Sequence, residues 1–220
     1  CKAVADSLGG TLMMDEDLLE EVNYIVEYPT AFYGEFEKSY LSLPKEAIIT
    51  PMKEHQRYFP VLDADGKLLN KFITVRNGDS YAIDNVKRGN EKVLDARLSD
   101  ALFFYHEDTK KPLEAYVERL DTIVFQKKLG TILDKTKRIQ NLSEKIAKAL
   151  ALTLPNLDRA AYLSKADLTT AMVFEFTELQ GIMGRYYANL SNEPSEVAEA
   201  IYEHYLPRFA GDELPSTNEG

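Results

Sequence analysis

The sequence predicts an α+β fold, with a mixed α/β segment containing a β-hairpin, followed by an all-helical domain. Two alternating strand-like runs, RYFPVLD and KLLNKFITVRN, flank the tight-turn signal ADG at positions 64–66. From about Asp84 onward, apolar residues instead recur at helical spacing. We therefore expect a mixed segment at 1–85 and a helical domain at 86–220.

The first segment begins with a predicted helix at 14–29, which Asp15 can cap and Pro29 can stop. Its predicted inward face consists of Leu18, Val22, Ile25 and Val26. Residues 31–43 are strand- or loop-like.

A short helix is predicted at 43–55, because Pro44 suits the first helical position. Pro51 argues against its second half. In the hairpin, Pro60 indicates that the first strand lies at a sheet edge or begins there, since proline donates no ladder hydrogen bond.

Further helices are predicted in the second half of the chain. One begins at Pro112, and a long amphipathic helix spans 130–152. Its predicted inward residues are Ile132, Leu133, Ile139, Leu142 and Ile146. Residues 156–176 are apolar on all sides and predict a buried central helix, and a last helix lies between Pro194 and Pro207.

Composition indicates a globular protein, with 45% hydrophobic and 28% charged residues among 220. The single cysteine, Cys1, excludes an internal disulfide framework and favours a reducing compartment, so we expect a cytoplasmic protein. No apolar run is long enough to span a bilayer, and no membrane partner is expected. The chain lacks an initial methionine and ends in a loop-like tail, which suggests a piece of a longer protein.

The net charge of −10 argues against a protein that coats nucleic acid in general. The charge is uneven, however. Positions 126–150 hold seven basic and two acidic residues, a local net charge of +5. Such a patch can bind phosphates, although the solvated face of an amphipathic helix is the simpler explanation.

No self-contained catalytic site is evident. The chain has no glycine-rich phosphate loop or serine nucleophile elbow, and YHED at 105–108 supplies one histidine where a helical zinc site needs two. We therefore expect no metal and no catalytic residue. Gly181 and Gly184 precede Arg185 in a helical pattern, and they serve either close helix packing or the approach of an RNA backbone.

The mouth of the hairpin carries polar side chains suited to phosphate or to a single-stranded RNA end: Lys53, His55, Gln56 and Arg57. Tyr58 and Phe59 follow them, either to stack on bases or to fill the sheet core.

Four stretches together resemble the beta subunit of bacterial glycyl-tRNA synthetase. They are TPMKEHQRYFPVLDADGKLLNKFITVRNG, GNEKVLDARLSDALFFYHEDTKKPLEAYVERLDTIVFQKKLGT, SKADLTTAMVFEFTELQGIMGRYYA and HYLPRFAGDELP. The resemblance implies an enzyme that joins glycine to tRNA(Gly), in which the alpha subunit uses ATP and Mg²⁺ and the beta subunit positions the tRNA. It also implies that the chain is an N-terminal-to-middle piece of that subunit and itself needs no cofactor.

The same resemblance suggests that the first segment is related to the B3/B4 module of phenylalanyl-tRNA synthetases and the second to HD-type domains. Active HD domains are metal-dependent phosphohydrolases with a His-Asp pair. Here Ala166 precedes Asp167, so the imidazole ligand is missing and Asp167 is expected to be a buried hydrogen-bonding residue.

We thus predict a chain that recognises tRNA without chemistry of its own. The candidate RNA-binding residues are Lys53, His55, Gln56, Arg57, Arg76, Arg88, Lys127, Lys128, Lys135, Arg138 and Arg185. Two alternatives are an HD-type phosphohydrolase and a scaffold that docks the alpha subunit without binding RNA.

Overall fold

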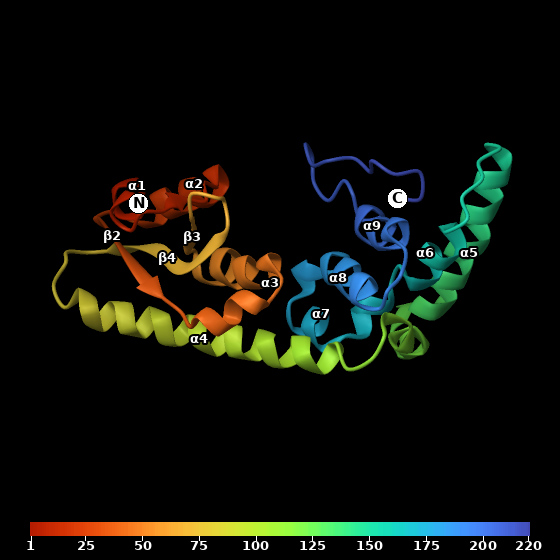
Figure 1. Ribbon diagram of the computed structural model, residues 1–220, viewed down its shortest axis with the longest axis horizontal. Helices are drawn as coiled ribbons and strands as arrows, with labels where there is room; N and C mark the ends of the chain where they lie inside the picture. Colours follow the sequence, from red (N-terminus) through yellow and green to blue (C-terminus); the bar gives the residue numbers. More distant parts are fainter. The chain divides into compact units, whose positions relative to one another are not determined.

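A four-stranded antiparallel sheet and nine α-helices confirm the predicted α+β class (Figure 1). The computed structural model describes residues 1–220 and consists of two compact units, Cys1–Phe103 and Phe104–Gly220. The division falls within helix α4 (Ile83–Asp108), whereas the sequence analysis placed the boundary near the beginning of this helix. No helix combines the length and apolar content needed to cross a membrane.

The sheet of the first unit has the strand order β1-β3-β4-β2. Its strands are β1 (Thr11–Leu12), β2 (Pro29–Glu35), β3 (Phe59–Leu62) and β4 (Leu68–Asn77). The predicted hairpin is β3–β4. The carboxylate of Asp63 accepts from the backbone N–H groups of Asp65 and Lys67, both at 2.9 Å, and Gly66 adopts a left-handed φ of +76°. The turn therefore forms for the reason that the ADG signal indicated.

Pro60 is the second residue of β3 and lies beside a register shift, so it stands near the beginning of its strand as expected. β3 is not an edge strand, because the two-residue β1 pairs with it. The carbonyl of Pro60 accepts from the Met13 N–H at 2.9 Å, which needs no donor from proline.

Helices flank the sheet of the first unit (Figure 1). They are α1 (Lys2–Ser7), α2 (Glu16–Ile25), the 3₁₀ turn η1 (Lys38–Ser42), α3 (Lys45–Thr50) and the π-helical turn η2 (Pro51–His55). Asp15 caps α2 as predicted, accepting from the Leu18 N–H at 2.9 Å. The helix ends before Pro29 is reached, and Ile25 is exposed rather than inward. Pro51 does not stop the helical path, because the chain widens into a π-turn there.

The second unit is mainly helical, with the 3₁₀ turns η3 (Leu113–Tyr116) and η4 (Glu118–Thr122) where a longer helix was predicted after Pro112. A small hairpin, β5 (Val124–Gln126) and β6 (Gly130–Thr131), follows, so this part of the chain is not all-helical. The remaining elements are α5 (Ile132–Ala149), α6 (Leu157–Leu163), η5 (Ala166–Thr169), α7 (Ala171–Glu175), η6 (Thr177–Leu179), α8 (Ile182–Leu190) and α9 (Ser195–Glu203).

Two predictions about these helices are wrong. The expected central helix at 156–176 is broken into α6, η5 and α7, because buried side chains bind backbone groups between the pieces. On α5, Leu142 and Ile146 are 58% and 49% exposed instead of inward. Thr136 and Ala147 are the buried residues of that helix.

Candidate nucleic-acid interface

The β5–β6 hairpin is built by local hydrogen bonds at its turn. The side-chain oxygen of Gln126 accepts from the N–H groups of Lys128 at 2.6 Å and Leu129 at 3.1 Å. Gly130 then adopts a left-handed φ of +84°, which favours glycine. These contacts place Lys127 and Lys128 at the exposed tip between the strands.

A capping box joins this hairpin to α5. The Thr131 hydroxyl accepts from the Asp134 N–H at 3.3 Å, and the Asp134 carboxylate accepts from the Thr131 N–H at 3.0 Å. The Thr131 backbone donor, with smaller contributions from Lys137 and Arg138, holds the pKa of Asp134 below its usual range. The Asp134 carboxylate thus caps the N-terminus of α5. The spacing of Thr131 and Asp134, three residues apart, is the sequence signal for this capping box.

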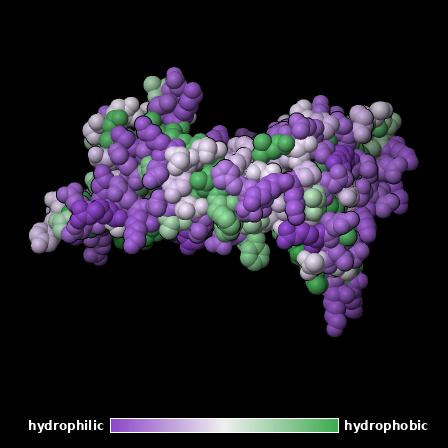
Figure 2. All heavy atoms as spheres, turned by 60° about the horizontal axis from the view of Figure 1, so that its bottom comes forward, coloured by the Kyte–Doolittle hydropathy of each residue, from purple (hydrophilic) through white to green (hydrophobic).

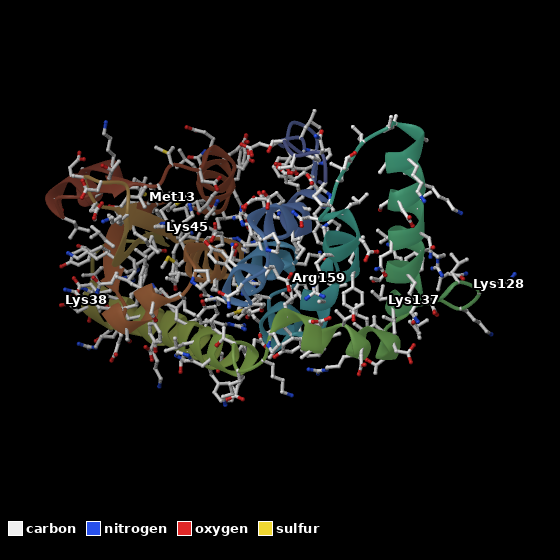
Figure 3. All side chains as sticks on the ribbon, turned by 45° about the vertical axis from the view of Figure 1, so that its right-hand side comes forward. Met13, Lys38, Lys45, Lys128, Lys137 and Arg159 are labelled. Atoms are coloured by element: carbon white, nitrogen blue, oxygen red, sulfur yellow. The ribbon has the colours of Figure 1, made fainter.

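The basic residues of the hairpin and of the first half of α5 form one surface, which we call the hairpin–helix surface: Lys127, Lys128, Lys135, Lys137 and Arg138. Lys135 Nζ lies 4.3 Å from the ring centroid of Phe125. Arg138 Nη1 donates to the Leu129 carbonyl at 2.9 Å. Lys127 and Lys128 make no ion pair. Figure 3 shows Lys128 on the loop that extends beside α5 and Lys137 on that helix.

This geometry leaves cations available to an anionic partner. Phosphate binding is favoured where several cations share one side and have no competing carboxylate. The structure therefore brings together Lys127, Lys128, Lys135 and Arg138 of the predicted residues. It adds Phe125, a 40% exposed ring that the sequence analysis did not identify.

At the hairpin mouth of the first unit, the structure brings His55, Gln56 and Arg57 to one depression of about 300 Å³, lined also by Val22 and Thr74. The basic side chains of this region already interact with protein groups. Lys53 pairs with Asp15, and Arg57 donates to Glu21 at 2.7 Å and to the Glu54 carbonyl. Binding phosphate here would require these pairs to open.

Tyr58 and Phe59 are core residues, 3% and 0% exposed, so they cannot stack on bases. The Tyr58 ring stacks on Phe72 with centroids 4.5 Å apart. Gly34 leaves room for the Phe72 ring, because a Cβ there would lie 2.2 Å from Phe72 Cζ. Of the two alternatives in the sequence, the sheet core is correct.

The other three candidate arginines lie apart along the chain and contact protein groups. Arg76 Nη1 donates to the Tyr81 carbonyl at 2.6 Å, and Arg88 contacts Asn85. Arg185 pairs with Glu199 at 3.4 Å and lies 4.3 Å from the Tyr202 ring centroid.

The glycines before Arg185 serve helix packing. A Cβ at Gly184 would lie 2.6 Å from Ile201 Cγ2, and one at Gly181 would lie 2.4 Å from the Tyr205 ring. Gly181 also has a left-handed φ of +77°. Close approach of α9 therefore explains both positions.

Asp167 is fully buried, as expected of a hydrogen-bonding residue. Its Oδ2 accepts from the Gly181 N–H at 2.6 Å, and burial raises the pKa of its carboxyl to about 6. No group of three or more His, Cys, Asp or Glu side chains is placed to hold a metal ion.

A buried basic cluster next to Asp167 was not foreseen. Lys165 Nζ lies 2.6 Å from His204 Nε2 and 3.8 Å from the Tyr205 ring centroid. Burial lowers the pKa of Lys165 to about 8 and that of His204 to about 4. Because both groups are basic, the close contact requires that at least one is neutral.

The fold and the surface define a two-unit α+β protein that presents a basic hairpin and helix. The family model for the glycyl-tRNA synthetase beta subunit matches residues 1–220, and the chain belongs to that family. It is 67% identical to the glycine–tRNA ligase beta subunit of Clostridioides difficile (strain 630), over 100% of this chain and 32% of that relative. It is 57% identical to the subunit of the same name from Bacillus subtilis (strain 168), over 96% of this chain and 31% of the relative. The chain thus spans about a third of the length of the curated relatives it matches.

Proposed function

We propose that this chain recognises and positions tRNA(Gly) within the beta subunit of a glycine–tRNA ligase. In this proposal the alpha subunit is the partner, and it carries out the ATP- and Mg²⁺-dependent glycylation. The chain itself contributes binding and orientation and no catalytic group. Family membership supports the ligase assignment.

The single observation that carries RNA binding is the hairpin–helix surface. Its tip lysines, Lys127 and Lys128, make no ion pair, and the one carboxylate in the first turn of α5 is held by the capping box. In a chain of net charge −10, such a concentration of available cations is a place where a polyanion can dock.

The test is the affinity of the protein for tRNA(Gly), measured by fluorescence anisotropy over a range of salt. We expect the double charge reversal Lys127→Glu and Lys128→Glu to weaken binding and to reduce its salt dependence. The matched control is Lys38→Glu with Lys45→Glu, which changes the net charge by the same amount at two exposed lysines of the first unit (Figure 3). Equal loss in both variants would indicate a general charge effect and contradict the proposal.

A second candidate function is contact with another protein, such as the alpha subunit. The second half of α5 and the residue that follows it favour this function, because Leu142, Ile146 and Leu150 recur every four residues and are 58%, 49% and 63% exposed. We expect this apolar row to be unnecessary for RNA binding. The change Ile146→Asp should therefore abolish co-purification with the alpha subunit while the affinity for tRNA stays unchanged. The reverse pattern would assign α5 to RNA alone.

A further inference from the structure

A cavity in the second unit has a volume of about 1000 Å³. It is open on one side and is lined by the end of α4, the loop after it, η3, η4, η5 and α7. Its lining combines apolar and aromatic side chains with basic ones and with the carboxylates of Glu107, Asp108 and Glu175. Among the residues that line it are Lys111, Tyr116, Arg119, Leu168 and Phe174. Cavities of this size and character accommodate flat organic ligands.

Buried hydrogen bonds hold the wall of this cavity in place. The Asp108 carboxylate accepts from the N–H groups of Ala171 at 2.8 Å and Met172 at 2.9 Å, and from the Tyr187 hydroxyl at 3.0 Å. The Thr169 hydroxyl donates to the Tyr116 carbonyl at 2.9 Å. The cavity is therefore preformed, which lowers the cost of binding.

An aromatic ring stands at the edge of the cavity. Phe174 lines it and is 82% exposed, although it follows three buried or half-buried residues of α7. Figure 2 shows mainly hydrophilic side chains on one face of the molecule, with small hydrophobic patches among them. Exposed aromatic faces stack on nucleobases of any sequence.

Three basic and three acidic side chains line the cavity, among them the carboxylates of Glu107 and Asp108, which are bonded within the protein. Asp108 is used by the α7 terminus, and Lys110 pairs with Glu107. The remaining charged lining residues are the cations Lys111 and Arg119 and one carboxylate, Glu175. The guanidinium of Arg119 lies 5.8 Å from the Tyr116 ring centroid.

The cavity is also continuous with the hairpin–helix surface. Ile123 lines the cavity and is the residue directly before β5. Its carbonyl accepts from the Ile132 N–H at 2.8 Å, so the hairpin with Lys127 and Lys128 rises from the cavity wall. A smaller apolar cavity of about 280 Å³ shares Ile123, Leu168 and Phe174.

We propose that this cavity binds an unpaired nucleobase of the RNA, which stacks on Phe174 while the adjoining phosphates contact Lys111 and Arg119. The inference rests on the proposed function, because the same RNA would lie on the hairpin–helix surface. It assigns to the second unit the stacking role that the buried Tyr58 and Phe59 cannot perform.

The test compares two RNAs with the full-length protein, namely a stem-loop with a six-nucleotide single-stranded tail and the same stem-loop without the tail. Phe174→Ala should weaken binding of the tailed RNA roughly tenfold, because base–aromatic stacking contributes on this order. Binding of the tail-less RNA should not change. Phe209→Ala is the matched control, since Phe209 is a 67% exposed phenylalanine outside the cavity. Both side chains are exposed, so folding should survive both changes.

Each outcome separates the inference from the function it rests on. If Phe174→Ala leaves the affinity for tailed RNA within about twofold while Lys127→Glu with Lys128→Glu weakens both RNAs, the cavity does not hold a base but the surface still binds RNA. If the lysine variant changes neither RNA, the proposed function fails as well. If Phe174→Ala instead abolishes co-purification with the alpha subunit at unchanged RNA affinity, the cavity holds a protein side chain and the inference is wrong.

Discussion

Asp108 joins the end of α4 to α7 and α8 through its buried carboxylate. It is 4% exposed and accepts three hydrogen bonds, two from the first N–H groups of α7 and one from Tyr187 of α8. Hydrogen bonds to a charged acceptor contribute about 1.5–3 kcal/mol each. Asp108→Ala removes all three and leaves buried donors unpaired. Since burying the carboxylate itself carries a cost, we expect a loss of about 4–6 kcal/mol in the free energy of unfolding.

A loss of that size is comparable with the whole stability of many domains. The assay is a guanidinium titration followed by circular dichroism, with amide hydrogen exchange to localise the effect to α7 and α8. Asp108→Asn should lose only about 2 kcal/mol, because its side-chain oxygen still accepts. Asp100→Ala, an exposed aspartate on the same helix, should change little. A loss below about 1 kcal/mol for Asp108→Ala would refute the reasoning.

Three further predictions concern the last helices. Gly184→Ala should cost about 1–3 kcal/mol, measured by denaturation, because its Cβ would lie 2.6 Å from Ile201 Cγ2. In the folded protein the pKa of His204 is about 4, below its ordinary 6.5. The free energy of unfolding should therefore decrease as pH falls from 6.5 to 4, because the unfolded chain takes up the proton first. His204→Gln should abolish that part of the pH dependence in the free energy of unfolding. Burial raises the pKa of Glu203, but hydrogen bonds from Ser216 and Thr217 outweigh it and lower the pKa to about 2. The same bonds hold the C-terminal segment against α9. Glu203→Ala should therefore speed proteolysis of residues 213–220.

Matched comparisons make these tests specific. Gly89→Ala on α4 meets no atom within 4 Å and should not destabilise. An unchanged pH profile in His204→Gln would show that the imidazole is not the titrating group. Glu199→Ala, on the same helix as Glu203, should leave the proteolysis rate unchanged.

Local signals predicted the elements that local contacts build. The beginning of α2 was predictable because Asp15 caps it through the N–H of Leu18, only three residues later. The β3–β4 hairpin was predictable because its turn is held by bonds from Asp65 and Lys67 to the nearby Asp63. The beginning of α7 inside the segment 156–176 could not be predicted in this way, because its first N–H groups are bonded to Asp108, more than 60 residues away. Tertiary contacts there override a strong apolar pattern.

The candidate site was predictable to the same extent. The excess of basic residues at 126–150 pointed to Lys127 and Lys128. They make no ion pair because few carboxylates lie near them in the sequence. The count could not show that Lys53 and Arg57 pair with Asp15 and Glu21, which lie far earlier in the chain. It also could not show that Tyr58 is buried while Phe174 is exposed.

The most direct test of the central claim is the salt dependence of tRNA(Gly) affinity for the wild type and for the variant Lys127→Glu with Lys128→Glu. Each lost phosphate contact lowers the slope of log affinity against log salt by about 0.7–0.9. We predict a slope reduced by at least about 1.5, with no such change for Lys38→Glu with Lys45→Glu. A wild-type slope that persists in the first variant would contradict RNA binding at the hairpin–helix surface.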